Sequence, residues 1–170
     1  MRVQSALLLL ILCTIILTGC DSDKISRLEK QNQELQAQIQ KQEAAADLDL
    51  QAKCSKDAKT FFVEGWRRDK NTTLLEYMNH YNKKENKCFI FVEYHYDSDF
   101  AGPNGVSWTN DMTVYDVYEN VKYGYFAENH ISYYKPTIRT SDEVISCEFL
   151  DKKCTSIQEF NFFARPYMNN

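Results

Sequence analysis

The sequence predicts an α+β protein: an N-terminal helical spacer, with a coiled coil as one form of it, followed by an antiparallel β-sheet packed against two helices. Three observations support this fold class. Residues 21–60 contain no Gly, Pro or aromatic residue and are rich in Gln, Ala, Lys, Glu and Asp, a composition that favours helix. Every Phe, Tyr and Trp lies from Phe61 onward, where apolar and polar residues alternate as in strands. The last residues return to a helical pattern, which we expect Pro166 to end.

Composition excludes several other classes of protein. A chain of 170 residues is long enough for one modest domain and little more. Its net charge is −4 and it has no block of Lys and Arg, so we expect no nucleic-acid partner, because phosphate binding needs a concentrated basic face. An aromatic content of 14% is too high for a disordered chain, and five Gly with three Pro exclude collagen-like material.

The N-terminus has the pattern of an export signal. Arg2 precedes an apolar run over residues 6–17, which is shorter than the roughly 18 residues that span a bilayer as a helix. The following Leu17-Thr18-Gly19-Cys20 resembles the lipobox of bacterial lipoproteins. This resemblance implies that residues 1–19 are a signal peptide and that Cys20 is lipidated, which anchors the protein in the bacterial cell envelope facing the periplasm. Several acyl chains on one residue would hold it there essentially permanently.

The residue after the lipobox bears on which membrane holds the anchor. In enterobacterial lipoproteins an Asp at the position of Asp21 resembles the signal for retention in the inner membrane. Other Gram-negative bacteria follow a looser rule. The resemblance therefore favours the inner membrane and leaves the outer membrane open.

Residues 20–53 are expected to form the helical spacer between the lipid and the domain. Read as heptads, they place an Asn in an otherwise mostly apolar seam, and a buried Asn at an a position specifies the register of a parallel dimer. Residues 25–46 are thus a candidate for a parallel homodimer, while a single solvated helix or a flexible tether fits the same pattern. As a continuous helix, residues 21–53 would span about 50 Å. The a and d positions are Ile25, Leu28, Asn32, Leu35, Ile39, Gln42 and Ala46.

Four of the six cysteines belong to the domain, because Cys13 leaves with the signal peptide and Cys20 is expected to be lipidated. An even set of Cys in an exported chain indicates disulfides, since the periplasm is oxidising. Four cysteines allow three pairings, and the short separation of Cys147 and Cys154 favours that pair together with Cys54–Cys88. A zinc site is disfavoured because no two of the four have the Cys-x2-Cys spacing.

The domain itself is expected over residues 54–170, with its strands at residues 73–81, 88–96, 112–118, 121–126 and 143–150. Before the strands, residues at helical spacing from Cys54 to Gly65 form one apolar helix face. After them, Ser156 and Glu159 form a capping box that starts the last helix. We expect both helices to cover the same face of the sheet.

Five short motifs in this domain resemble a scattered group of uncharacterised exported bacterial proteins, over residues 54–168. The group has no activity to transfer, so the resemblance implies export and leaves the chemistry open. The motifs are Cys54-x3-Ala58-x3-Phe62, Asn82-Lys83-Lys84, Lys87-Cys88-Phe89, Asp116-Val117-Tyr118-Glu119 and Cys154-x-Ser156-x2-Glu159-Phe160.

Residue patterns for catalysis or metal binding are sparse. The sequence has no motif that names a Ser or Cys nucleophile. His80 and His95 are expected to face each other across a hairpin, an arrangement more typical of an inert surface than of a site. Residues 97–108 begin like a calcium loop, with acids at positions one and three, but Ala101 and Trp108 stand where two further ligands belong, so we expect a turn. We expect no enzymatic activity, no cofactor and no metal.

The density of tyrosine favours a binding function. Six of the Tyr residues fall within a short stretch and are too many for one small core, so some are expected at the surface, where Tyr makes contacts at low entropic cost. A glycan or an envelope protein is the expected partner. Two alternatives stay open: a cell-wall or glycan hydrolase that uses carboxylates not paired by the sequence, and an exclusion or immunity lipoprotein carried by a prophage or plasmid. The candidate binding residues are Tyr115, Tyr118, Tyr123, Tyr125, Tyr133 and Tyr134.

Overall fold

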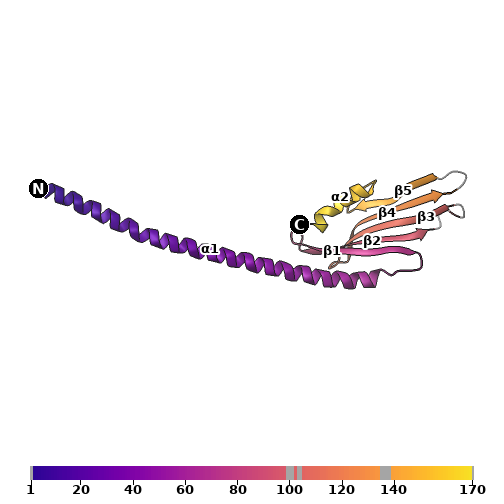
Figure 1. The fold of residues 1–170 in the computed structure, drawn as a ribbon, viewed down its shortest axis with the longest axis horizontal. Coiled ribbons are helices and arrows are strands. Elements are labelled where there is room, and N and C mark those ends of the chain that lie inside the picture. Colours follow the sequence, from indigo (N-terminus) through magenta and orange to yellow (C-terminus); the bar gives the residue numbers. More distant parts are fainter. Residues whose placement is uncertain (1, 99–101, 103–104, 135–138, 170) are drawn as a thin grey trace. The chain divides into compact units, whose positions relative to one another are not determined.

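The structure, a computed structural model, describes the backbone of residues 2–98, 102, 105–134 and 139–169, and the side chains of these residues from Ser22 onward except Arg139. Its fold is α+β, as the sequence predicts: a long N-terminal helix, an antiparallel sheet and a C-terminal helix (Figure 1). The elements are α1 (Arg2–Gly65), β1 (Thr72–Asn82), β2 (Lys87–Ser98), β3 (Gly105–Asp116), β4 (Val121–Tyr133), β5 (Arg139–Phe149), β6 (Lys152–Lys153) and α2 (Ile157–Met168).

The chain divides into two compact units, Met1–Ala46 and Asp47–Asn170. Residues 20–53 all lie within α1, which confirms that this stretch is helical. The second unit begins before Cys54, because the preceding turn of α1 already contacts the sheet: Gln51 Oε1 accepts a hydrogen bond from the backbone N–H of Tyr81 at 2.9 Å, and Asp47 pairs with Lys83 at 2.9 Å. Among the residues described with side chains, no helix combines the length and apolar content needed to cross a membrane.

The described strands form one antiparallel sheet in the order β1-β2-β3-β4-β5-β6, so each strand pairs with its neighbours in sequence. Two of the tight turns place an Asn in the left-handed region, Asn86 with φ 53° and Asn120 with φ 54°, a conformation that Asn tolerates better than most residues. The expected strands are all present, but β3 begins well before residue 112 and β4 continues well past residue 126. The added lengths contain Asn110, Asp111, Glu128 and Asn129, residue types that are uncommon in strands.

The expectation that both helices cover one face of the sheet is wrong: α1 and α2 pack on opposite faces. The reason lies in β2, whose residues 88–92 are apolar without interruption and buried on both sides. Cys88, Ile90 and Val92 pack with Cys54 and Ala58 of α1. Their alternate neighbours, including Phe89 and Phe91, belong to the core under α2.

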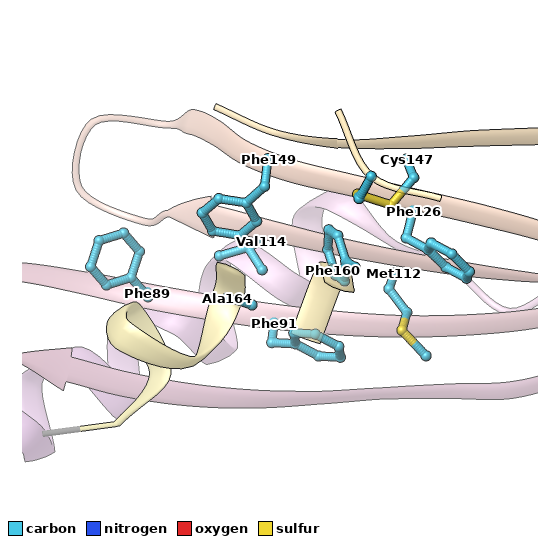
Figure 2. Close-up of a cluster of buried hydrophobic side chains, with 10 residues drawn as sticks. Phe89, Phe91, Met112, Val114, Phe126, Cys147, Phe149, Phe160 and Ala164 are labelled. Carbon is cyan, nitrogen blue, oxygen red and sulfur yellow. A yellow bond between two sulfur atoms is a disulfide. The ribbon is translucent and has the colours of Figure 1, made fainter. Parts of the chain in front are cut away.

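Helix α2 covers an aromatic core (Figure 2). Phe160 and Ala164 point from α2 toward side chains of β2, β3, β4 and β5, and both are buried. The predicted capping box is present, since Ser156 accepts a hydrogen bond from the backbone N–H of Glu159 at 3.3 Å. Pro166 does not end the helix as expected: α2 runs on to Met168, because a proline in the last turn removes only one backbone donor near the helix end.

Two disulfides connect these layers in the pairing that the spacing favours. Cys54 of α1 bonds to Cys88 of β2, with their Cα atoms 5.3 Å apart. Cys147 of β5 bonds to Cys154, just after β6, with their Cα atoms 4.9 Å apart. The first bond therefore joins α1 to the sheet, and the second closes the short connection that leads into α2.

Candidate functional site

A groove of about 650 Å³ lies on the α1 face of the sheet, beside the end of α1. On this face α1 packs mainly on β1 and β2, which leaves β3 and β4 as the floor of the groove. Alternate residues of β3 point into it, because side chains two apart on a strand share a face. The residues that carry its chemistry are Phe61 and Trp66 from the end of α1, Tyr94 from β2, Asp111 and Tyr115 from β3, and Tyr125 from β4.

One end of the groove is an aromatic cluster. The ring of Tyr115 lies 5.5 Å from that of Phe61 and 5.8 Å from that of Trp66, the latter nearly perpendicular. Trp66 follows the last residue of α1, and its backbone N–H donates to the carbonyl of Phe62 at 3.0 Å. Edge-to-face ring contacts of this kind stabilise a fixed arrangement beyond the area that they bury. The cluster is therefore a pre-formed apolar surface.

The floor of the groove carries a carboxyl group held by a phenol. The hydroxyl of Tyr125 donates to Asp111 Oδ1 at 3.2 Å. Burial raises the pKa of Asp111 above its ordinary value, although the hydrogen bond from Tyr125 opposes that rise. Burial and the nearby charge of Asp111 raise the pKa of Tyr125 to about 12, so its hydroxyl keeps its proton. The pair offers a ligand one hydrogen-bond acceptor beside the aromatic cluster.

Polar groups complete the edge of the groove. Lys122 lies with its ammonium 5.2 Å from the centre of the Tyr125 ring, within the range of a cation–π contact. Thr113, Asn120 and Glu64 also line the groove. Polar groups on the floor and at the edge thus lie beside an apolar aromatic surface, an arrangement that can orient a bound small molecule.

A buried carboxylate fixes the turn that contains Asn120 and leads into β4, where Lys122 lies. Asp116 is fully buried, and its Oδ1 accepts hydrogen bonds from the backbone N–H groups of Tyr118 at 3.0 Å and Glu119 at 3.4 Å. Lys87 Nζ lies 2.8 Å from Asp116 Oδ2 and 2.6 Å from Glu119 Oε2. These hydrogen bonds raise the pKa of Lys87. The Asp116-Val117-Tyr118-Glu119 motif therefore has a structural role in the turn between β3 and β4.

The structure distributes the six candidate tyrosines over several places. Tyr115 and Tyr125 line the groove. Tyr123 belongs to the core under α2, with its ring 5.0 Å from that of Phe89. Tyr118 lies under the ammonium of Lys53, 4.2 Å from the ring centre. Tyr133 and Tyr134 are exposed at the end of β4.

Sequence reasoning missed several groove residues, chiefly Trp66, Tyr94 and Asp111. A signal for Asp111 was present, since residues 111, 113 and 115 alternate within the β3 segment and share one face. The contribution of Trp66 and Tyr94 depends on how α1 meets β2 and β3, and no short-range pattern encodes that contact.

The expected facing of His80 and His95 is wrong. His80 pairs with Phe89 and His95 with Leu74, because the tight turn after β1 sets the register of the hairpin. His95 instead lies 2.9 Å from Glu93 and stacks on Trp108, on the face of the sheet away from the groove.

The segment that begins like a calcium loop runs from Asp97 to Trp108, and these two residues are cross-strand partners in β2 and β3. Residues 99–101 and 103–104 of this segment lie outside the described residues.

Within the described residues, no group of three His, Cys, Asp or Glu side chains is placed to hold a metal ion. Both domain cysteine pairs are disulfide-bonded. The side chains of Cys20 and Asp21 lie outside the described residues, so the lipidation prediction stays a prediction. Comparison of the chain with protein-family models, with curated proteins and with solved structures found no match.

Proposed function

We propose that this chain is an envelope lipoprotein, anchored through a lipid on Cys20 and preferentially in the inner membrane, whose periplasmic domain binds a glycan in the groove beside the end of α1. The anchor is supported by Leu17-Thr18-Gly19-Cys20 and the short apolar run before it. The two disulfides suit an oxidising compartment.

The observation that carries the binding proposal is the position of Trp66 and Tyr115 beside the Asp111–Tyr125 pair in one groove. Sugar rings present C–H groups on their faces and hydroxyl groups at their edges. Fixed aromatic rings match the former, and a carboxyl with neighbouring amide and ammonium groups matches the latter. A volume of about 650 Å³ lies within the range of small-ligand sites, which favours a glycan over the flat surface of a protein partner.

The groove contains one of the two Trp residues, which provides a direct assay. Trp108 belongs to the opposite face of the sheet, so a Trp108→Phe background leaves Trp66 as the reporter. Titration of the full chain in detergent with soluble oligosaccharides, including N-acetylglucosamine oligomers, is expected to change the Trp66 fluorescence in a saturable way. Calorimetry then measures the same affinity with the native Trp residues.

Substitution separates the groove from the rest of the surface. Tyr115→Ala and Asp111→Ala are each expected to weaken glycan binding about tenfold, the equivalent of about 1.4 kcal/mol. Tyr134→Ala is the matched control, since Tyr134 is exposed and does not line the groove. Equal affinity for the wild type and the Tyr115→Ala variant, with both correctly folded, would contradict the proposal.

The anchor has a separate test. Cells grown with an alkyne analogue of palmitate are expected to label the wild-type protein and leave a Cys20→Ser variant unlabelled. A wild-type protein without label would exclude the anchor and leave the binding result untouched.

Glycan hydrolysis is a second candidate function, favoured by the environment of Asp111. A carboxyl whose pKa is raised by burial can act as a general acid, and glycosidases use two carboxyl groups. Glu64 is a second carboxylate on the rim of the same groove. Release of reducing ends by the wild type, abolished in Asp111→Asn, would indicate hydrolysis; saturable binding without such release would support binding alone.

A further inference from the structure

The spacer part of α1 carries an apolar stripe that is exposed among the residues of its unit whose side chains the structure describes. Ile25, Leu28, Leu35 and Ile39 have between 54% and 56% of their surface exposed. They follow one another at spacings of three, seven and four residues, so they lie along one face of the helix. The residue between the two pairs is Asn32, at the spacing that continues the same face. Large apolar side chains in a continuous exposed row indicate an interaction surface.

We propose that this stripe is the seam of a parallel, two-stranded coiled coil formed by two copies of this chain. The residues at the a and d positions of the seam indicate how many helices the coiled coil contains. The a positions hold β-branched Ile25 and Ile39, and the d positions hold Leu28 and Leu35. This distribution, Ile at a and Leu at d, favours two strands over three or four.

Asn32 determines the register in which the two helices align. In a parallel pair in register, an Asn at an a position faces its own copy, and the two amides can bond to each other across the seam. A shift of one heptad would place each Asn against an apolar side chain and leave its amide buried without a hydrogen-bond partner, which is unfavourable. The single Asn therefore selects one alignment of the two helices.

The charges beside the seam favour the parallel orientation of the two helices. In a parallel pair, position g of one helix lies beside position e of the following heptad on the other helix. Lys24 occupies a g position and Glu29 the e position that follows, so each dimer contains this pair of opposite charges twice. The remaining g–e pairs contain at least one uncharged Gln, so no like charges meet; they are Gln31 with Gln36 and Gln38 with Glu43.

Anchoring agrees with this orientation, a point that rests on the proposed function. Two copies held in one membrane through Cys20 both start at the same surface, so their spacers run in the same direction. About three heptads make a weak pair in dilute solution. Confinement to a membrane raises the effective concentration of one helix near the other and so offsets the short length.

Disulfide crosslinking of the full chain in envelope vesicles tests the proposal. A parallel pair in register places Gln42, at a d position, against its own copy, whereas Gln40, two positions earlier, points away from the seam. Both residues are exposed in the single chain. Under mild oxidation, Gln42→Cys is expected to give a covalent dimer at least tenfold faster than the matched control, Gln40→Cys.

Two further results decide the outcome. Leu28→Lys with Leu35→Lys, added to Gln42→Cys, is expected to reduce crosslinking at least tenfold, while the far-ultraviolet circular dichroism of the domain stays unchanged. Equal crosslinking at positions 40 and 42, a monomer at every protein density, or a crosslink to a different envelope protein would each overturn the proposal. Palmitate labelling is read separately, so selective crosslinking in an unlabelled chain would uphold the dimer and overturn only the anchor.

Discussion

Tyr125 of β4 donates its hydroxyl hydrogen to Asp111 of β3, 3.2 Å away, across a diagonal of the sheet in which Tyr125 itself pairs with Thr113. Because burial raises the pKa of Asp111 above 3.8, the folded protein binds a proton on the Asp111 carboxyl more tightly than the unfolded chain does. The resulting stability is fully present below the unfolded pKa and is lost as the pH rises through the folded pKa. At pH values above the unfolded pKa, burial of the Asp111 carboxyl therefore destabilises the fold.

Asp111→Asn is accordingly expected to raise the free energy of unfolding at neutral pH, with a gain that shrinks as the pH falls toward the ordinary range of a carboxyl. Urea denaturation of both proteins at several pH values measures this difference. Tyr125→Phe serves as the companion variant: it removes a hydrogen bond that favours the charged carboxylate, so the pH dependence is expected to steepen. A difference between Asn and Asp that stays constant with pH would contradict the assignment.

Lys87 compensates the buried charge of Asp116 in the turn that leads to the groove. Lys87→Met leaves that carboxylate without its cation and is expected to lower the free energy of unfolding by about 2 kcal/mol, less than the usual 3–5 kcal/mol because Lys87 is partly exposed. Adding Asp116→Asn is expected to restore part of the loss, since an amide oxygen still accepts from the turn backbone. A double-mutant cycle by chemical denaturation checks both; a double variant less stable than Lys87→Met alone would contradict this account.

The two disulfides are expected to contribute unequally. On the loop-entropy model, Cys54–Cys88, with a separation of 34 residues, stabilises the fold by about 3.8 kcal/mol, and Cys147–Cys154, with a separation of 7, by about 2.4 kcal/mol. Replacing each pair with Ser and measuring unfolding in denaturant tests the order. A larger loss for the shorter loop would show that local packing, rather than chain entropy, dominates.

Gly124 has no room for a side chain. A Cβ there would overlap the ring of Phe149 and lie 3.0 Å from that of Phe160, under α2. Gly124→Ala is therefore expected to lower the free energy of unfolding by about 1–3 kcal/mol through overpacking. Gly65 is the matched control: nothing lies within 4 Å of its added Cβ, so Gly65→Ala at the end of α1 is expected to leave the thermal midpoint unchanged or raise it. Equal effects at the two positions would contradict this explanation.

Local sequence patterns were sufficient to predict the structural features that depend on residues close together in the chain. The lack of Gly, Pro and aromatic residues over residues 21–60 predicted the helical spacer, and Ser156 with Glu159 predicted the start of α2. The short separation of Cys147 and Cys154 selected the disulfide pairing. Each of these features involves residues a few positions apart, where helix geometry, capping or loop length determines the outcome.

The tertiary structure alone decided which sides of the sheet the two helices occupy and where the groove forms. Residues 88–92 are apolar on both faces, so the sequence signalled burial without assigning α1 to one face and α2 to the other. The groove joins Trp66, Tyr94, Asp111 and Tyr125 from four elements. Their proximity follows from strand register and helix docking, which are set by the sum of many weak contacts between residues distant in the chain, and no short stretch of sequence records that sum.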